Sequence, residues 1–130
     1  MVRAEAIRRD GGCVATTLVP EVTCGGILEV DEIQGRGVRP GGHLVAGNTQ
    51  VLCSRHHQWK TEHPLGAQMR GLALPSWAGD DERQEAAQLR VWWAHGNATH
   101  PSWWSDSERD AWPIPNNRRL HSPPLEGGPL

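Results

Sequence analysis

The stretch from Leu52 to Thr61 constrains the fold most, because it carries a thiol, two adjacent imidazoles and a lysine. Such a density of potential metal ligands is untypical of ordinary surface or core.

The chain has 130 residues, neither Phe nor Tyr, and 37% hydrophobic residues, so we expect one domain with a small core. Small cores commonly depend on a disulfide or a metal. An odd number of cysteines and an N-terminus without a signal-like apolar run favour the metal.

Two cysteines upstream of this stretch, Cys13 and Cys24, offer further ligands. A glycine pair directly precedes the first cysteine and another directly follows the second. Glycine lets a chain fold back closely enough for two thiolates to reach one ion. The alternative is that both thiols are small buried apolar groups, which is the usual place of a free cysteine. We favour the zinc interpretation.

Helical geometry divides the ligands of the central stretch between two partners. Cys53 and His56 are three residues apart, so they share one face at the start of a helix. His57 points about 100° away from His56, because a helix has 3.6 residues per turn. The predicted set of structural zinc ligands is therefore three thiolates and one imidazole: Cys13, Cys24, Cys53 and His56.

His57 is then free to meet the carboxylates Asp31 and Glu32 at the end of a predicted strand. An ion bound by only one imidazole and one carboxylate keeps open coordination positions. Such a site suits a divalent ion that takes part in hydrolysis, rather than a structural ion surrounded by protein ligands. The sequence thus predicts two sites, one that holds the fold together and one that can do chemistry.

The hydrophobic pattern predicts an α+β chain. We expect a short basic helix over 2–9, a strand over 27–33, an extended segment over 44–52, and helices over 53–62, 65–77 and from Asp80 or Asp81 to His95. In the strand, alternation predicts Leu28 and Val30 inward, with Glu29 and Asp31 outward. No stretch approaches the length of a membrane span.

The C-terminal half differs in composition from the first half. Residues 78–115 are a predicted helical, tryptophan-rich extension, and the Pro-, Gly- and Asn-rich residues 116–130 are a predicted disordered tail. The tryptophan pairs at 92–93 and 103–104 can stack on bases, fill a pocket of a partner, or pack in the chain's own core. Packing within the molecule is the preferred interpretation, because the chain has neither Phe nor Tyr to form an aromatic core.

The order of these residues resembles the HNH endonuclease family, particularly its small phage-type members. The pattern comprises Cys13 and Cys24, the stretch LEVDEI at 28–33, a glycine-rich loop, Asn48, and LC-x2-HH-x2-KT at 52–61. It covers residues 3–77, and we take 1–77 as the predicted nuclease domain.

The resemblance implies a ββα-metal, treble-clef-like fold that holds a catalytic ion beside a structural zinc. Asp31 and His57 would bind Mg²⁺, Mn²⁺ or Ni²⁺, Asn48 would hold the loop or strand that orients the site, and Glu32 would be the general base. Such an enzyme hydrolyses DNA phosphodiester bonds. The phage-type members further imply DNA processing or packaging in the cytoplasm of a bacterial host, with packaging proteins as partners.

The chain departs from the family pattern at three points. Glu32 stands where a histidine is usual, and a carboxylate with a reference pKa of about 4.3 is a weaker base near neutrality than an imidazole at about 6.5. Ten residues separate Cys13 from Cys24, which is more than usual, although loop-closure entropy grows slowly with length. His56 replaces a more usual cysteine.

Arg36 and Arg39 in the glycine-rich loop, and Lys60 about one turn beyond His56, are the candidate phosphate contacts. The formal net charge of −2 excludes binding to DNA by bulk charge, so such contacts must be local. Besides the endonuclease, two functions stay open: a catalytically weakened module that binds nucleic acid or protein, and a zinc-stabilised structural protein.

Overall fold

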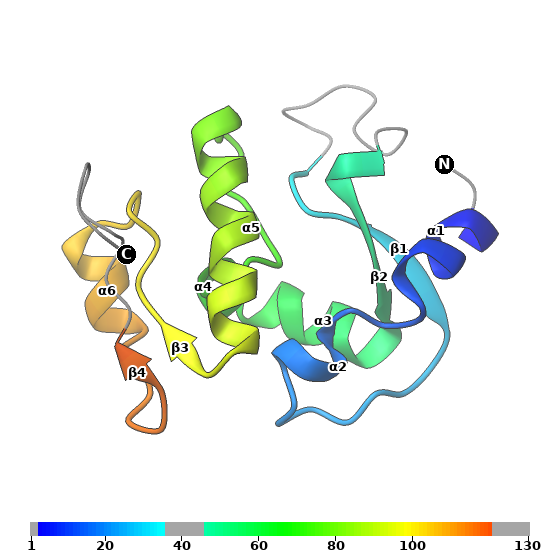
Figure 1. Ribbon diagram of the computed structural model, residues 1–130, viewed down its shortest axis with the longest axis horizontal. Coiled ribbons are helices and arrows are strands. Elements are labelled where there is room, and N and C mark those ends of the chain that lie inside the picture. The colour runs from blue at the N-terminus through cyan, green and yellow to red at the C-terminus, as the bar shows by residue number, and fades with distance from the viewer. Residues whose placement is uncertain (1–2, 36–45, 121–130) are drawn as a thin grey trace.

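The computed structural model describes residues 3–35 and 46–120, and its elements lie along the chain in the order shown in Figure 1. Helix α5, Asp80–Ala94, separates an N-terminal assembly of two strands and short helices from the C-terminal elements (Figure 1). Small sheets and several helices make the chain α+β, as the sequence predicts.

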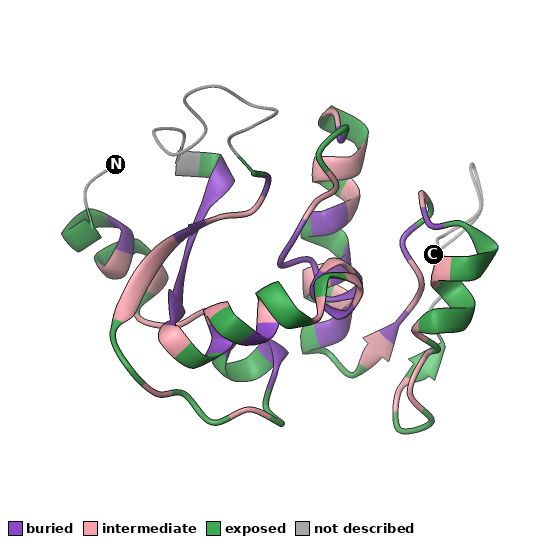
Figure 2. Cartoon of the chain, turned by 180° about the vertical axis from the view of Figure 1, so that it is seen from behind, coloured by how far each residue is buried: buried purple, intermediate pink, exposed green. Residues whose placement is uncertain are grey.

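A two-stranded antiparallel hairpin carries the residues of interest. Strand β1, Leu28–Glu32, pairs with β2, Thr49–Cys53, and the register places Asp31 opposite Gln50. Strand β2 is buried along its whole length, which Figure 2 shows as a continuous purple strand. Helix α3, Ser54–Glu62, begins directly after β2, so the strand end and the first helical turn form one rigid unit.

The N-terminal segment packs along this hairpin. Helix α1, Arg3–Asp10, contacts both strands, and the Asp10 carboxylate accepts the backbone N–H of Val51 at 2.8 Å. The Val51 carbonyl in turn accepts the N–H of Val14 at 2.9 Å. Because both groups of Val51 bond to the N-terminal segment, that segment covers the outer edge of β2.

The ten residues between the first two cysteines form ordered structure. They contain the short helix α2, Ala15–Leu18, whose two ends are buried in the core. Farther along, the carboxylate of Glu21 forms a two-bond pair with the guanidinium of Arg70, at 2.9 and 2.7 Å. The segment between the two cysteines is therefore packed against the rest of the domain. The burial of its side chains offsets the entropy cost of closing this loop.

Helices α4 and α5 form the other side of the core. Helix α4, Pro64–Met69, is shorter than the predicted 65–77 helix and ends in a turn at Gly71. Gly71 has φ of +74°, and a Cβ there would lie 2.3 Å from the carbonyl oxygen of Ala86, so only glycine allows this approach to α5. The N-cap of α5 is Gly79 rather than Asp80 or Asp81.

The C-terminal elements are β3, Asn97–Ala98, which pairs in parallel with β4, Arg119–Leu120, and helix α6, Asp106–Ala111. Of the C-terminal elements, β3 contacts α5 directly. Strand β4 lies within residues 116–130, the predicted disordered tail, and pairs with β3. Residues 121–130 lie outside the described part of the chain.

One hydrophobic core spans the predicted domain boundary at residue 77. It joins Leu18, Leu52 and Met69 to Trp93 and Trp104, so residues 78–115 share the core of the first part. Packing of the tryptophan pairs inside the molecule is confirmed for Trp93 and Trp104. Within the described ranges, none of the helices combines the length and apolarity that a bilayer crossing requires.

Candidate metal centre and adjoining cleft

Three thiols and one imidazole meet at the start of α3. The Nδ1 atom of His56 lies 3.4 Å from Sγ of Cys13, 3.4 Å from Sγ of Cys24 and 3.1 Å from Sγ of Cys53. The four candidate ligand atoms all lie within 4.8 Å of one another. Zinc held by thiolates at about 2.3 Å and an imidazole at about 2.0 Å needs S···N separations of about 3.5 Å. The cluster is therefore close enough to bind a metal such as zinc.

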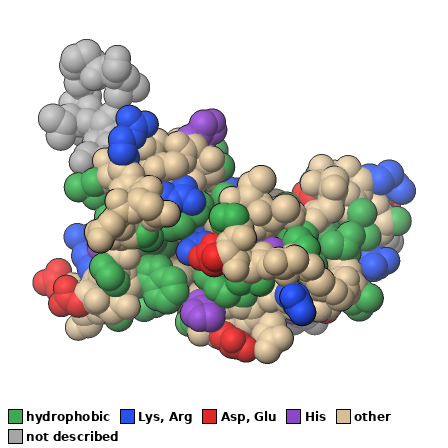
Figure 3. Space-filling view, turned by 90° about the horizontal axis from the view of Figure 1, so that it is seen from below, with side chains coloured by type: hydrophobic (Ala, Val, Ile, Leu, Met, Phe, Trp, Pro, Cys, Tyr) green, Lys and Arg blue, Asp and Glu red, His purple; other side chains and the backbone are tan. Residues whose placement is uncertain are grey.

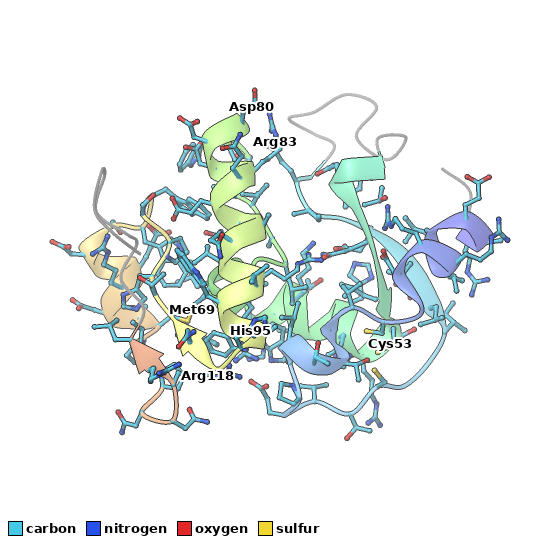
Figure 4. The ribbon with its side chains drawn as sticks, viewed as in Figure 1. Cys53, Met69, Asp80, Arg83, His95 and Arg118 are labelled. Carbon is cyan, nitrogen blue, oxygen red and sulfur yellow. The ribbon has the colours of Figure 1, made fainter. Side chains whose placement is uncertain are left out.

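Local structure holds Cys13, Cys53 and His56 in this thiol–imidazole cluster. Cys13 follows the turn that ends α1, where Gly11 and Gly12 have positive φ angles of 71° and 127°. Cys53 ends β2 and is the N-cap of α3, and its sulfur accepts the N–H of His56 at 3.4 Å. Figure 4 shows sulfur atoms gathered near Cys53, where β2 meets α3. The Cys-x2-His spacing thus acts as both a helix cap and a pair of ligands.

The orientation of His56 leaves Nδ1 as its ligand atom. Its Nε2 lies 3.0 Å from the carbonyl oxygen of Val19, an acceptor, so Nε2 carries the proton. The lone pair of Nδ1 then points at the three sulfurs. A backbone acceptor on the far nitrogen is the usual way in which a metal-binding histidine is fixed.

The thiols of the cluster have strongly different affinities for protons. Burial raises the pKa of the Cys13 thiol to about 11, and the neighbouring thiols of Cys53 and Cys24 add to the effect. Burial opposes ionisation of Cys53 as well, but N–H groups of His56 and Gly25 and the His56 ring bring its pKa down to about 6. Because the raised pKa keeps the Cys13 thiol protonated near neutrality, metal binding at this thiol must release its proton.

His57 lies on the other side of α3, between two carboxylates of β1. Its Nδ1 is 2.5 Å from Oε2 of Glu29, and its Nε2 is 3.3 Å from Oδ1 of Asp31. Hydrogen bonding to His57 lowers the pKa of the Glu29 carboxyl. When Nδ1 donates to Glu29, the Nε2 atom of a neutral ring presents a lone pair to Asp31. A proton or a cation between the two atoms removes the repulsion.

A cleft of about 310 Å³ opens beside this histidine. The residues that line it include Asp31, His57 and Lys60, together with Glu32 and Pro64. Asp31 is only 7% exposed although its strand position was predicted to face outward. Asp31 is buried because α3 folds back over the face of β1 that carries Glu29 and Asp31.

Lys60 is engaged with the cleft carboxylate. Its ammonium donates to Oδ2 of Asp31 at 2.5 Å and to the backbone carbonyl of Glu32 at 2.8 Å. The ammonium that is predicted to contact phosphate therefore also binds the Asp31 carboxylate. Arg36 and Arg39, the other predicted phosphate contacts, lie outside the described residues. On the face shown in Figure 3, the described Lys and Arg side chains are scattered and form no continuous basic patch.

Glu32 lines the cleft, but its position on β1 directs its side chain away from that of Asp31. The β1–β2 register is regular through Glu32, which pairs with Thr49, so its side chain leaves the strand on the face opposite to Asp31. Cross-strand partners share a face, and the hydroxyl of Thr49 accepts a bond from Arg9 at 3.1 Å. The Oε2 atom of Glu32 is buried from solvent.

Asn48, which the motif resemblance implies would hold the loop or strand that orients the site, lies directly before β2. Its buried side chain accepts the backbone N–H of Gln34 at 2.9 Å and donates to the Gln34 carbonyl at 3.0 Å. These two bonds tie the end of β1 to the start of β2. They lie beside the cleft rather than in it, since Asn48 does not line it.

Sequence reasoning missed Glu29 and Gln50 as members of the site. Glu29 is two residues before Asp31 on the same strand. Because side chains two residues apart on a strand lie on the same face, the sequence alone could have placed Glu29 beside Asp31. Gln50 donates to Oδ2 of Asp31 at 2.9 Å, and it could be found only from the pairing register of the hairpin.

Comparisons with known proteins leave the chain without a demonstrated family. A scan against protein-family models found no match, and searches of curated proteins and of solved structures found no significant match.

Proposed function

We propose that the chain is a metal-dependent endonuclease that hydrolyses phosphodiester bonds in DNA, with a structural zinc in the thiol–imidazole cluster. The observation that carries the proposal is the position of His57 and Asp31. They lie in an open cleft directly beside a closed four-ligand cluster, on a hairpin followed by a helix. This arrangement supports a treble-clef-like ββα-metal fold. The choice of DNA, and of phage DNA processing with packaging proteins as partners, comes from the motif resemblance.

The donor atoms in the cleft fit a divalent cation. Adjacent ligands on an octahedral ion at about 2.1 Å are about 3.0 Å apart, and Oδ1 of Asp31 is 3.3 Å from Nε2 of His57. These two atoms would hold the ion, with open positions left for water and phosphate oxygens. Mg²⁺, Mn²⁺ or Ni²⁺ would supply Lewis-acid stabilisation of the charge that develops on the scissile phosphate.

The surrounding side chains orient the two donors. Glu29 accepts from Nδ1 of His57 and thereby turns Nε2 toward Asp31. Lys60 binds Oδ2 of Asp31, which leaves Oδ1 on the side of His57. The ammonium also adds positive charge at the cleft, where it can approach a phosphate oxygen. The four groups together form a polar, preorganised site for an anionic substrate.

A plasmid-nicking assay with Mg²⁺, Mn²⁺ and Ni²⁺ tests the proposal. We expect wild-type protein to nick DNA and the cleavage rate of His57→Ala to fall by at least about 100-fold. Removing a residue that binds the metal directly should lower the rate more than removing a residue that only orients such a ligand. His95→Ala is the matched control, since His95 is an exposed histidine at the end of α5. Equal rates for wild type and His57→Ala would rule out the role of His57.

A second candidate function is a binding module without nuclease activity. The observation that favours it is the bond between Lys60 and Asp31, because the ammonium already neutralises the carboxylate that would hold the ion. Wild-type protein that binds DNA in a fluorescence-anisotropy titration, but cleaves none with any of the three metals, would favour this function over the endonuclease.

A further inference from the structure

A buried glutamine lies beside the proposed catalytic carboxylate. Gln50 is 1% exposed and pairs with Asp31 across the hairpin. Its amide nitrogen donates to Oδ2 of Asp31 at 2.9 Å and to the carbonyl oxygen of Leu72 at 2.7 Å. Both hydrogens of the side-chain amide are therefore used, and one of them fixes the carboxylate.

The oxygen of the same amide is held by an arginine from α5. Nη2 of Arg90 lies 2.5 Å from Oε1 of Gln50, and it also donates to the carbonyl of Gly71 at 3.0 Å. An arginine only donates, so it fixes which end of the amide is oxygen. If this contact were lost, the amide could rotate and present its oxygen to Asp31, which would repel the carboxylate.

We infer that Arg90 and Gln50 are positioning residues of the cleft, which act by holding the Asp31 carboxylate with Oδ1 toward His57. This inference rests on the proposed function, because it makes α5 part of the nuclease centre. The 78–115 extension then contributes to the site as well as to the core. Arg90 does not line the cleft, so it acts only through Gln50.

The arrangement explains how Asp31 keeps one oxygen available. Its Oδ2 receives two donors, Lys60 and Gln50, at 2.5 and 2.9 Å. Two donors on one oxygen lock the carboxylate plane. Partners of this kind behind a metal-binding carboxylate typically change metal affinity or activity by about 10- to 100-fold when removed.

The first test follows the Gln50 side-chain amide by NMR in the zinc-loaded protein without any other divalent ion. The resonances are identified by their loss in Gln50→Met. We expect slow exchange with water in wild type, and a shift with faster exchange in both Arg90→Met and Asp31→Asn. Arg90→Lys should restore part of the wild-type behaviour, because an ammonium can still donate to the amide oxygen.

Arg83→Met is the matched control on the same helix. Arg83 lies about two turns before Arg90 and donates to the oxygen of another buried glutamine, Gln34, at 3.0 Å. Figure 4 shows it next to Asp80 at the N-terminal end of α5. The substitution removes the same kind of bond without touching Asp31, so it should leave the Gln50 amide resonances unchanged.

The second test measures Mn²⁺ affinity and the kinetics of DNA cleavage. We expect Arg90→Met to weaken Mn²⁺ binding and lower kcat by about 10- to 100-fold with KM for DNA nearly unchanged, and Arg83→Met to change neither. An unchanged Gln50 amide, or unchanged Mn²⁺ affinity and kcat, in Arg90→Met would overturn the inference. A wild type that neither binds Mn²⁺ nor cleaves DNA would overturn the proposed function, and the amide measurement would still decide whether Arg90 and Gln50 hold Asp31.

Discussion

The two neighbouring histidines at the start of α3 lie in opposite kinds of environment. His56 is 1% exposed and meets three thiols, so four protein donors surround one point. The side chain of His57 is 40% exposed and meets two carboxylates at the edge of a cleft. A closed set of protein ligands holds a fold together, whereas an open set leaves room for water and substrate. A step of one residue on α3, a rotation of about 100°, thus separates the closed ligand set from the open one.

The two rings are also held in opposite orientations. His56 directs Nε2 to the Val19 carbonyl and Nδ1 to the thiols, while His57 directs Nδ1 to Glu29 and Nε2 to Asp31. In each case the second nitrogen is bound to an acceptor, which fixes the atom that faces the ligand position. From this difference we expect substitutions around His56 to lower the stability of the fold, and substitutions around His57 to lower activity without a loss of stability.

Removal of metal from the thiol–imidazole cluster should have the largest effect. Structural zinc sites contribute about 10–16 kcal/mol in small domains, and this chain has a small core. We expect a strong chelator to abolish the cooperative thermal transition followed by circular dichroism. Restoring Zn²⁺ is the control and should return the transition. A melting curve that does not change with chelation would remove the structural role of the cluster.

Substitution of Glu29 should have an intermediate effect, confined to the His57 side. Loss of the acceptor in Glu29→Ala frees the His57 ring to rotate, and we expect Mn²⁺ affinity and cleavage rate to fall by about 10- to 100-fold. Zinc content and the thermal transition should stay close to wild type. Glu62→Ala, an exposed glutamate on the same helix, is the control. Equal losses in both variants would argue against a specific role for Glu29.

Substitution of Glu32 should have the smallest effect. Its side chain leaves β1 on the face opposite to Asp31, so we expect Glu32→Gln to change the cleavage rate by less than about threefold. A general base contributes about 10²- to 10⁴-fold, so a loss of that size would restore Glu32 to the role that the motif predicts. The measurement is the pH–rate profile of both proteins with saturating Mn²⁺.

Local spacing in the sequence was enough to predict the thiol–imidazole cluster. Cys53 and His56 fall on one helical face because they are three residues apart, and glycines mark the turns at Cys13 and Cys24. These signals need no knowledge of the tertiary fold. The same spacing separated His57 from His56, and the structure brings His57 and Asp31 together as expected.

The remainder of the cleft depends on contacts that leave no local signal. The inward face of β1 was assigned from its apolar residues, but α3 covers the face with Glu29 and Asp31. The bond from Arg90 to Gln50 joins residues 40 positions apart and needs both the hairpin register and the close approach at Gly71. The position of Glu32 likewise follows from regular pairing through the end of the strand.

Zinc content of the purified protein tests the central claim, which is that adjacent histidines serve separate centres. The measurement is zinc per chain by elemental analysis, after dialysis against a weak chelator, for wild type, His56→Ala and His57→Ala. The account predicts one tightly held zinc in wild type and in His57→Ala, and its loss in His56→Ala. Loss of zinc in both variants, or its retention in both, would contradict the division of the two histidines.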